Sequence, residues 1–247
     1  KKRYTDFHRL DIVDRHGDSH RFWLRTIKNK PAEAALQSLS MQFRVQNELS
    51  DYLRRHSPAH LRLGCCESVM LLPQFNSIVT KECEGTLLNA SLVRTLPMLH
   101  RRGLLQTFRN VGVWLKAFHA GFREDVPADE HAKLAHNFEA QFQRPLRNEY
   151  SYATRCHFDY SPRNIFVGRG HVQVIDFAGS QPGVAQADLE FFSDYILAAR
   201  FNGLFTRSQK EALVDAFLEG YVNHPTSCAI AHSDTNAVAA SATPAVG

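Results

Sequence analysis

The sequence contains no apolar run of about 18 residues, the length that a membrane-spanning helix requires. Its first residues show no basic segment followed by an apolar segment, as a signal peptide would. Cysteine is scarce: five residues, an odd number, with no C-x-x-C spacing, which argues against a disulfide framework and against a zinc site. We therefore expect a protein without a membrane span, in a reducing compartment such as the cytoplasm.

Several catalytic signatures are also missing. There are thirteen histidines but no H-E-x-x-H motif, and G-x-S-x-G does not occur, so neither a zinc hydrolase nor a serine hydrolase of that type is supported. The formal net charge of +4 is too small and too evenly spread to indicate a nucleic-acid-binding protein. A mild positive excess is compatible with anionic ligands such as nucleotides.

The composition is that of a globular protein, with 44% hydrophobic and 11% aromatic residues. In residues 1–85, bulky and β-branched residues predict a strand pair within residues 7–30. Helical spacing of apolar residues follows Pro31 and continues to the Ser57-Pro58 boundary. Two further short strands are expected within residues 67–85. This part is predicted to be a small antiparallel sheet with one long helix.

Residues 86–223 have a different character. Helical periodicity is found in the stretches 92–122, 129–150, 188–203 and 207–222, so this part is predicted to be mainly helical. The last residues, 224–247, are rich in Ala, Ser and Thr without clear periodicity, and we expect a loose or disordered tail. The fold class predicted from these parts is α+β.

The stretch RCHFDYSPRNIFVGRGHVQVIDFAGS, residues 155–180, interrupts the helical part. Its two apolar runs, residues 165–167 and 172–175, predict a short hairpin. Four polar residues flank these runs: His157, Asp159, Asn164 and Asp176. Carboxylate and amide oxygens at one end of a hairpin suit Mg²⁺, which completes its coordination shell with phosphate and water. Phosphoryl transfer requires little more of a protein than positioning and charge neutralisation.

This stretch resembles the catalytic segment of the aminoglycoside phosphotransferase-like families, in which H-x-D-x-x-x-x-N is followed by I-D-F or I-D-W. Two further segments, SIVTKECEGTLL (residues 77–88) and NVGVWLKAFHA (residues 110–120), resemble the hinge strand and the helix before the catalytic loop in these families. The resemblance implies a two-lobed protein-kinase-like fold, in which the sheet and helix form an N-lobe and the helical part a C-lobe. It also implies a phosphotransferase that uses ATP or GTP with Mg²⁺.

Carried over residue by residue, the resemblance makes Asp159 the base that accepts the proton of the acceptor hydroxyl. Asn164 and Asp176 would hold the metal, and His157 would fix the loop by a hydrogen bond. Backbone groups of Glu82 and Cys83 would bind adenine.

The cation that anchors the nucleotide phosphates has two candidates. Lys28 ends an apolar-Lys pattern, and Glu48 lies twenty residues further on, where the usual Lys–Glu pair could form. Arg25 is the rival, because relatives often carry a basic residue directly after an aromatic-Leu pair, as in FWLR. The sequence favours Lys28.

The sequence departs from the family pattern at its start. No Gly-rich phosphate loop precedes residue 30, and the chain begins with Lys1, so we expect that a first strand with its loop is missing. The acceptor predicted from the resemblance is a hydroxyl of a small molecule, sugar or glycolipid headgroup, the last with peripheral membrane contact. It would be held by residues 122–155 and 190–222. The alternative is a non-catalytic nucleotide-binding pseudokinase.

Overall fold

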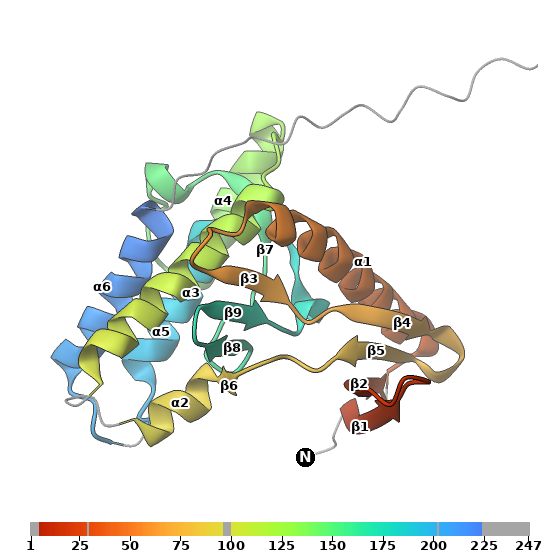
Figure 1. Cartoon of the computed structure of the whole chain (residues 1–247). Helices are drawn as coiled ribbons and strands as arrows, with labels where there is room; N and C mark the ends of the chain where they lie inside the picture. The colour runs from red at the N-terminus through yellow and green to blue at the C-terminus, as the bar shows by residue number, and fades with distance from the viewer. Residues whose placement is uncertain (1–4, 29, 96–99, 202, 224–247) are drawn as a thin grey trace, which may run out of the picture.

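The computed structural model describes residues 5–28, 30–95, 100–201 and 203–223. Its N-terminal part is a four-stranded antiparallel sheet with the long helix α1 packed against it (Figure 1). The sheet order is β1-β2-β5-β4. The elements are β1 Thr5–Val13, β2 Ser19–Ile27, α1 Ala32–His56, β4 Ser68–Leu72 and β5 Ser77–Lys81. The strand pair, the helix and the two later strands predicted from the sequence are confirmed.

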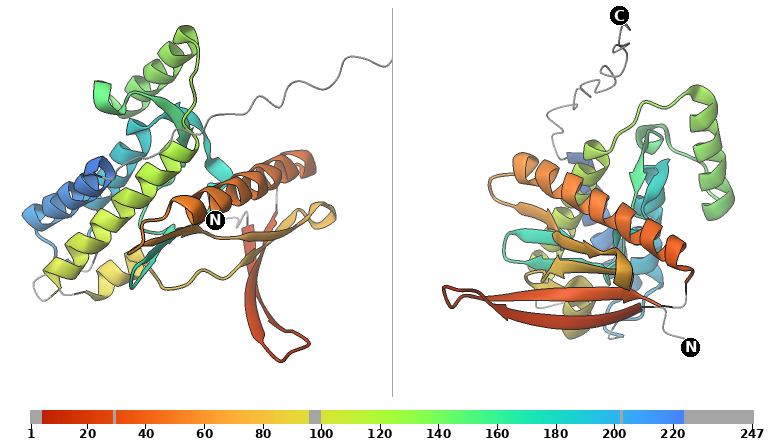
Figure 2. Two further views of the ribbon diagram at one scale, coloured as in Figure 1. Left: turned by 45° about the horizontal axis from the view of Figure 1, so that its top comes forward. Right: turned by 90° about the vertical axis from the view of Figure 1, so that its right-hand side faces the viewer.

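Helix α1 is positioned by its apolar face. Ala35 and Leu39 are fully buried against Ile27 of β2 and Ile78 of β5, which form a small core of their own. Removing such side chains from water is what holds an amphipathic helix on a sheet, since helix propensity alone is weak. The hairpin β1–β2 extends away from this helix (Figure 2).

A second sheet connects the N-terminal part to the hairpin of residues 165–174, which we call the catalytic hairpin after the role predicted for the residues beside it. Its order is β3-β9-β8-β6, and β3 pairs with β9 in parallel although about a hundred residues separate them. The strands are β3 Arg62–Cys65, β6 Thr86–Leu87, β8 Ile165–Gly168 and β9 His171–Val174. A two-stranded sheet pairs β7 Ala153–Cys156 with β10 Gln181–Val184. The sequence predicted β8 and β9 from two apolar runs on either side of a turn. Strands β3, β6, β7 and β10 were not predicted, because two to four residues carry no periodic signal and these strands lack such a neighbouring run.

Helices make up most of the C-terminal part, as predicted. They are α2 Leu88–Arg94, α3 Arg101–Gly121, α4 Ala128–Phe142, α5 Gln186–Ala198 and α6 Arg207–Asn223. Short 3₁₀ helices lie at Pro73–Phe75, Asn148–Tyr150 and Phe177–Gly179. The helical stretch expected at residues 92–122 is thus shared between two helices, α2 and α3.

One large core is common to both parts of the chain. Trp114 of α3 is fully buried, and its indole N–H donates to the carbonyl of Gly64 in β3 at 2.7 Å. Its ring stacks on Tyr160 beside the catalytic hairpin. The α+β arrangement with a sheet-and-helix lobe and a mainly helical lobe is therefore confirmed, while the division at residue 85 stays a prediction.

The predicted tail, 224–247, lies outside the described residues. Within the described residues, no helix is both long and apolar enough to cross a membrane.

Helices α3 and α6 touch backbone to backbone at two glycines. A Cβ atom at Gly112 would lie 2.0 Å from the carbonyl oxygen of Phe217, and one at Gly220 would lie 2.0 Å from that of Arg109. A contact this short requires a backbone shift, because carbonyl oxygens cannot rotate away as side chains do. The close approach of the two helices therefore depends on glycine.

We expect Gly112→Ala to lower the melting temperature by about 2–12 °C, since overpacking costs about 1–3 kcal/mol and each kcal/mol corresponds to about 2–4 °C at this size. Gly103→Ala is the matched control on the same helix, because a Cβ there meets nothing within 4 Å. Thermal denaturation followed by circular dichroism measures both. Equal melting temperatures for the two variants would contradict the proposed helix contact.

Candidate active site

The loop before β8 brings Asp159 and Asn164 into contact. The Asn164 side-chain amide donates to Asp159 Oδ2 at 2.9 Å and to the Asp159 carbonyl at 3.0 Å. The backbone of Asn164 is held by Ser161 and Ile175, through hydrogen bonds of 2.9 and 3.0 Å. Since the amide nitrogen is used within the loop, Oδ1 of Asn164 is the atom that can face a cation.

His157 is fully buried beneath this loop and fixes its shape. Its Nε2–H donates to the carbonyl of Ile175 at 2.9 Å, and its Nδ1 accepts from the Asp159 N–H at 3.3 Å. The first contact ties the loop to the end of β9, and the second orients the backbone of Asp159. These contacts fit the structural role predicted for His157.

Asp188 at the start of α5 is a second anchor of this loop. Its buried carboxylate accepts from the backbone N–H groups of His157 and Phe158 at 2.7 and 2.8 Å and contacts His119 at 3.1 Å. Phe158 has a φ of 58°, a left-handed conformation that is unfavourable for an aromatic residue. The carboxylate holds this turn in place, and so determines where Asp159 lies.

Asp176 follows the end of β9, at the same open end of the hairpin as Asn164, and it faces Arg25. The guanidinium Nη1 of Arg25 donates to Asp176 Oδ1 at 2.6 Å. The Arg25 side chain is only 14% exposed and that of Asp176 is 37% exposed. This ion pair joins the two lobes directly at the candidate site.

Helix α1 holds Arg25 through a residue that sequence analysis missed. The buried Gln42 accepts from Arg25 Nη1 at 2.9 Å. Gln42 and Gln46 lie one helical turn apart and hydrogen-bond to each other at 3.4 Å. Gln42 occupies the place in which the resemblance expected an acidic partner. Sequence reasoning considered only an acidic partner on this helix and therefore did not identify Gln42. The position of a Gln on the buried face of α1 was the signal that could have identified it.

The structure does not bring Lys28 or Glu48 to this site. Lys28 forms an ion pair with Asp6 near the end of the hairpin, and Glu48 is exposed on α1. Side chains alternate between the faces of a strand, so residues 25 and 28, an odd number apart, are expected on opposite faces. Arg25, the rival candidate, is the cation that meets Asp176.

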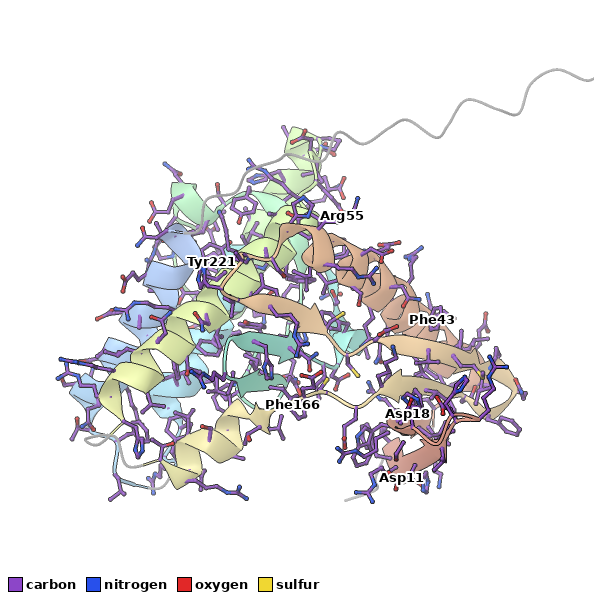
Figure 3. All side chains as sticks on the ribbon, in the orientation of Figure 1. Asp11, Asp18, Phe43, Arg55, Phe166 and Tyr221 are labelled. Carbon is purple, nitrogen blue, oxygen red and sulfur yellow. The ribbon has the colours of Figure 1, made fainter. Side chains whose placement is uncertain are left out.

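A cavity of about 960 Å³ lies between the two lobes at this point. One side has aromatic residues of the first sheet, Phe7, Phe22 and Trp23, and the other has Phe166 and Ile175. Figure 3 shows Phe166 near the middle of the molecule, close to the chain that leads from β5 to β6. The remaining lining includes Arg25, Asn164 and Asp176. Further charged residues, Arg21, Lys81, Glu82 and Glu84, also line the cavity. Arg25, Asn164 and Asp176 form what we call its charged end, and the combination with aromatic walls suits a ligand with an aromatic ring and anionic groups.

The model of a phosphotransferase enzyme family matches residues 87–230, more than half of the chain. This chain belongs to that family. A search of curated protein sequences gave no significant match. The two-lobed, protein-kinase-like α+β fold that the resemblance implied is confirmed for this phosphotransferase.

Three of the solved structures that match this chain are distant from it in sequence. An amicoumacin kinase in complex with AMP-PNP and Ca²⁺ is 12% identical, with 85% of this chain and 68% of that chain covered and a TM-score of 0.46. A choline/ethanolamine kinase family protein from Mesorhizobium loti is 15% identical, with 87% of this chain and 70% of that chain covered and a TM-score of 0.45. The ADP-bound aminoglycoside phosphotransferase APH(2'')-Ib is 12% identical, with 86% of this chain and 77% of that chain covered and a TM-score of 0.46. The family assignment rests on the sequence match.

The segment between the two lobes of this phosphotransferase lines the cavity with both predicted hinge residues, Glu82 and Cys83. Glu82 is held in place, since its N–H donates to the Arg21 carbonyl and its carboxylate pairs with Arg21 Nε, each at 3.0 Å. Within the described part of the chain, the backbone N–H and carbonyl of Cys83 have no hydrogen-bond partner. They are available to the edge of a ligand ring.

The turn between β1 and β2, residues 14–18, does not resemble a phosphate loop. Asp14 Oδ1 accepts from the N–H groups of His16 and Asp18 at 2.8 and 3.0 Å, and the N–H of Gly17 donates to the Asp14 carbonyl. A carboxylate thus already occupies the N–H groups that a phosphate would need. The hydrogen bonds of this turn therefore do not favour phosphate binding there.

Proposed function

We propose that this phosphotransferase transfers the γ-phosphoryl group of ATP to a hydroxyl group of a small molecule. Asp159 accepts the proton of the attacking hydroxyl, and Arg25 binds phosphate oxygens of the nucleotide. The aromatic walls of the cavity hold the adenine ring, with Cys83 supplying backbone hydrogen bonds. Chemistry of this kind depends on position and charge neutralisation more than on covalent participation by the protein.

The observation that carries this proposal is the meeting of Arg25, Asn164 and Asp176 in the lining of an aromatic cavity, with Asp159 hydrogen-bonded to Asn164. Arg25 comes from the first sheet and the other three from segments beside the catalytic hairpin, so their arrangement is a property of the folded chain. Arg25 Nε is also buried without a partner within the described residues. A buried donor without a partner costs about 1–3 kcal/mol, which an incoming phosphate oxygen would offset.

The residues at the charged end also fit a magnesium ion. Asn164 Oδ1 and the Asp176 carboxylate are hard oxygen donors, and two protein ligands leave room for the phosphate oxygens and water that Mg²⁺ prefers. When bound, the ion would neutralise charge on the transferred phosphoryl group. Since Arg25 pairs with Asp176 in the structure, nucleotide and metal would have to draw the two side chains apart.

We expect Asp176→Ala to lose magnesium-dependent nucleotide binding, because the variant lacks the charged metal ligand. Isothermal titration calorimetry with ATP, with and without Mg²⁺, measures this: the wild type should bind more tightly with Mg²⁺, and the variant should show no difference. Asp51→Ala is the control, as Asp51 is an exposed acid paired with Arg54 on α1. A variant that kept the full magnesium effect would remove Asp176 from the metal site.

The function itself is tested by a panel of hydroxyl-bearing acceptors with ATP and Mg²⁺, read by coupled ADP release. The panel should hold aminoglycosides, amino alcohols, sugars and glycolipid headgroups, because the sequence of the acceptor-binding segments does not choose among them. Acceptor-dependent ADP release, with the phosphorylated product seen by mass spectrometry, supports the proposal. Replacing ATP by GTP in the same assay decides the nucleotide.

A non-catalytic nucleotide-binding module is the second candidate. It is favoured by the Arg25–Asp176 ion pair, in which the proposed metal ligand Asp176 is already bound by a side chain of the N-lobe. It is also favoured by the absence of a phosphate loop from the β1–β2 turn. A thermal-shift assay separates the two functions. Stabilisation by ATP and Mg²⁺ without turnover of any acceptor would favour the module, whereas turnover excludes it.

A further inference from the structure

Two cysteines face each other on the wall of the cavity. Cys66 lies between β3 and β4, and Cys83 lies just after β5; both line the cavity. The antiparallel ladder of β4 and β5 brings these segments together, since the Lys81 N–H donates to the Glu67 carbonyl at 2.9 Å. The Cys66 thiol donates to the Lys81 carbonyl at 3.2 Å, next to the segment that carries Cys83.

Cys83 lies two residues beyond Lys81, so the two cysteine side chains border the same part of the cavity wall. A hydrogen bond from the Cys83 thiol lowers the pKa of Cys66, which Thr80 reinforces, while the same contact and burial raise the pKa of Cys83. Of the pair, Cys66 is therefore the first to form the nucleophilic thiolate. Both thiols are reduced in the structure.

We propose that Cys66 and Cys83 are a modification site, at which a hydroperoxide converts the two thiols into a disulfide on the wall of the nucleotide cavity. Neither the family match nor the phosphoryl-transfer chemistry requires these thiols. The effect on nucleotide binding rests on the function proposed above, whereas formation of the disulfide does not.

The chemistry balances with hydrogen peroxide as the oxidant. The Cys66 thiolate attacks one peroxide oxygen, the O–O bond breaks, and the leaving hydroxide takes up the proton of the former thiol as water. The Cys83 sulfur then attacks the Cys66 sulfenic acid, the S–O bond breaks, and a second water leaves. Two thiols are oxidised by two electrons, and one peroxide is reduced to two waters.

The neighbouring Cys65 cannot replace Cys66 in this reaction. Its side chain points to the opposite side, into the core, where it contacts Ser50 and the carbonyl of Gln46. Burial raises the pKa of Cys65 to about 12, so this thiol stays protonated. Cys65→Ser is therefore a matched control that changes a cysteine one position away.

A disulfide would restrain the segment that offers Cys83 to a ligand. An S–S bond of about 2.05 Å replaces a looser thiol contact, so the backbone of Cys83 must move toward residue 66. We expect this to reduce the fit of a nucleotide ring to the backbone groups of Cys83.

The test treats the full chain with hydrogen peroxide and maps its peptides under non-reducing conditions. Trypsin cuts after Arg62, Lys81 and Arg94, so the expected product links residues 63–81 to residues 82–94, with a mass 2 Da below the sum of the two. The link should form in the wild type and in Cys65→Ser, and should be absent from Cys66→Ser and Cys83→Ser. A folded wild type without this link, or a link that persists in Cys66→Ser, would overturn the proposal.

The consequence is measured separately by the thermal shift with ATP and Mg²⁺. Oxidation should abolish the shift in the wild type, dithiothreitol should restore it, and peroxide should not change the shift of Cys66→Ser. A linked protein that keeps the full shift would refute the effect on the cavity. If the reduced protein shows no shift, the proposed function fails, and the peptide map still decides the disulfide.

Discussion

Asp159→Ala reduces kcat by about 10³-fold while nucleotide affinity stays within about twofold of the wild type. The expectation follows from the role of the carboxylate as general base, which contributes about 10²–10⁴-fold to such reactions. Among the described residues, no hydrogen bond or ion pair joins Asp159 to Arg25 or Asp176. In the variant, Asn164 loses its bond to the carboxylate but keeps the one to the carbonyl of residue 159, so we expect the phosphate end of the cavity to stay in place. ADP release with the acceptor found in the panel measures kcat, and calorimetry measures affinity.

Two further variants separate basicity from structure. Asp159→Asn keeps the size of the side chain and an oxygen that can accept from Asn164, but it cannot take up a proton, so its kcat should fall as far. Asp129→Ala removes an exposed carboxylate that pairs with Lys133 on α4, and its kcat should be unchanged. Turnover of Asp159→Asn near the wild-type rate would show that the base lies elsewhere.

Arg25→Ala should weaken ATP binding by about 10- to 100-fold, and Lys28→Ala should leave it within about twofold. A hydrogen bond to a charged group contributes about 1.5–3 kcal/mol, and each 1.4 kcal/mol is a factor of ten. The ammonium group of Lys28 pairs with Asp6, so its removal should not change the affinity for ATP. Calorimetry with ATP and Mg²⁺ on both variants gives the ratio directly.

The loss in Arg25→Ala must be distinguished from a general loss of stability, because Asp176 and Gln42 both lose a partner. Arg25→Lys supplies the second comparison. It retains the charge but cannot reproduce the fork with which guanidinium contacts two side chains at once. We expect intermediate affinity for this variant. Weak binding by Lys28→Ala combined with normal binding by Arg25→Ala would return the anchoring role to Lys28.

Much of the fold could be predicted because its elements carry periodic signals. Helices α1, α3 and α6 each repeat apolar residues at helical spacing, and the hairpin β1–β2 alternates around a turn that contains Gly17. The pairing of β3 with β9 carries no such signal, since a parallel pair formed by distant four-residue strands leaves only a few ambiguous residues in each. Sequence reasoning therefore described the two lobes and missed the strand that joins them.

The candidate site, like the fold, has one part that could be predicted from the sequence and one part that could not. His157, Asp159, Asn164 and Asp176 lie within twenty residues, and a short loop and hairpin suffice to bring them near one another, so their motif could be recognised without the fold. Their contacts agree with the roles predicted for His157 and Asp159, while those roles remain to be tested by the variants above. The partners of the site on the N-lobe could not be recognised in this way.

The sequence by itself determined the family, the order of the secondary-structure elements and the local group that carries phosphoryl-transfer chemistry, because these depend on composition, periodicity and short spacing. Only the tertiary structure decided which cation meets Asp176 and which residue of α1 supports it. Arg25 lies 151 residues from Asp176, and their contact depends on how the first sheet docks on the hairpin. Strand alternation then places Arg25, rather than Lys28, toward the cavity, and helical spacing does the same for Gln42 rather than Glu48.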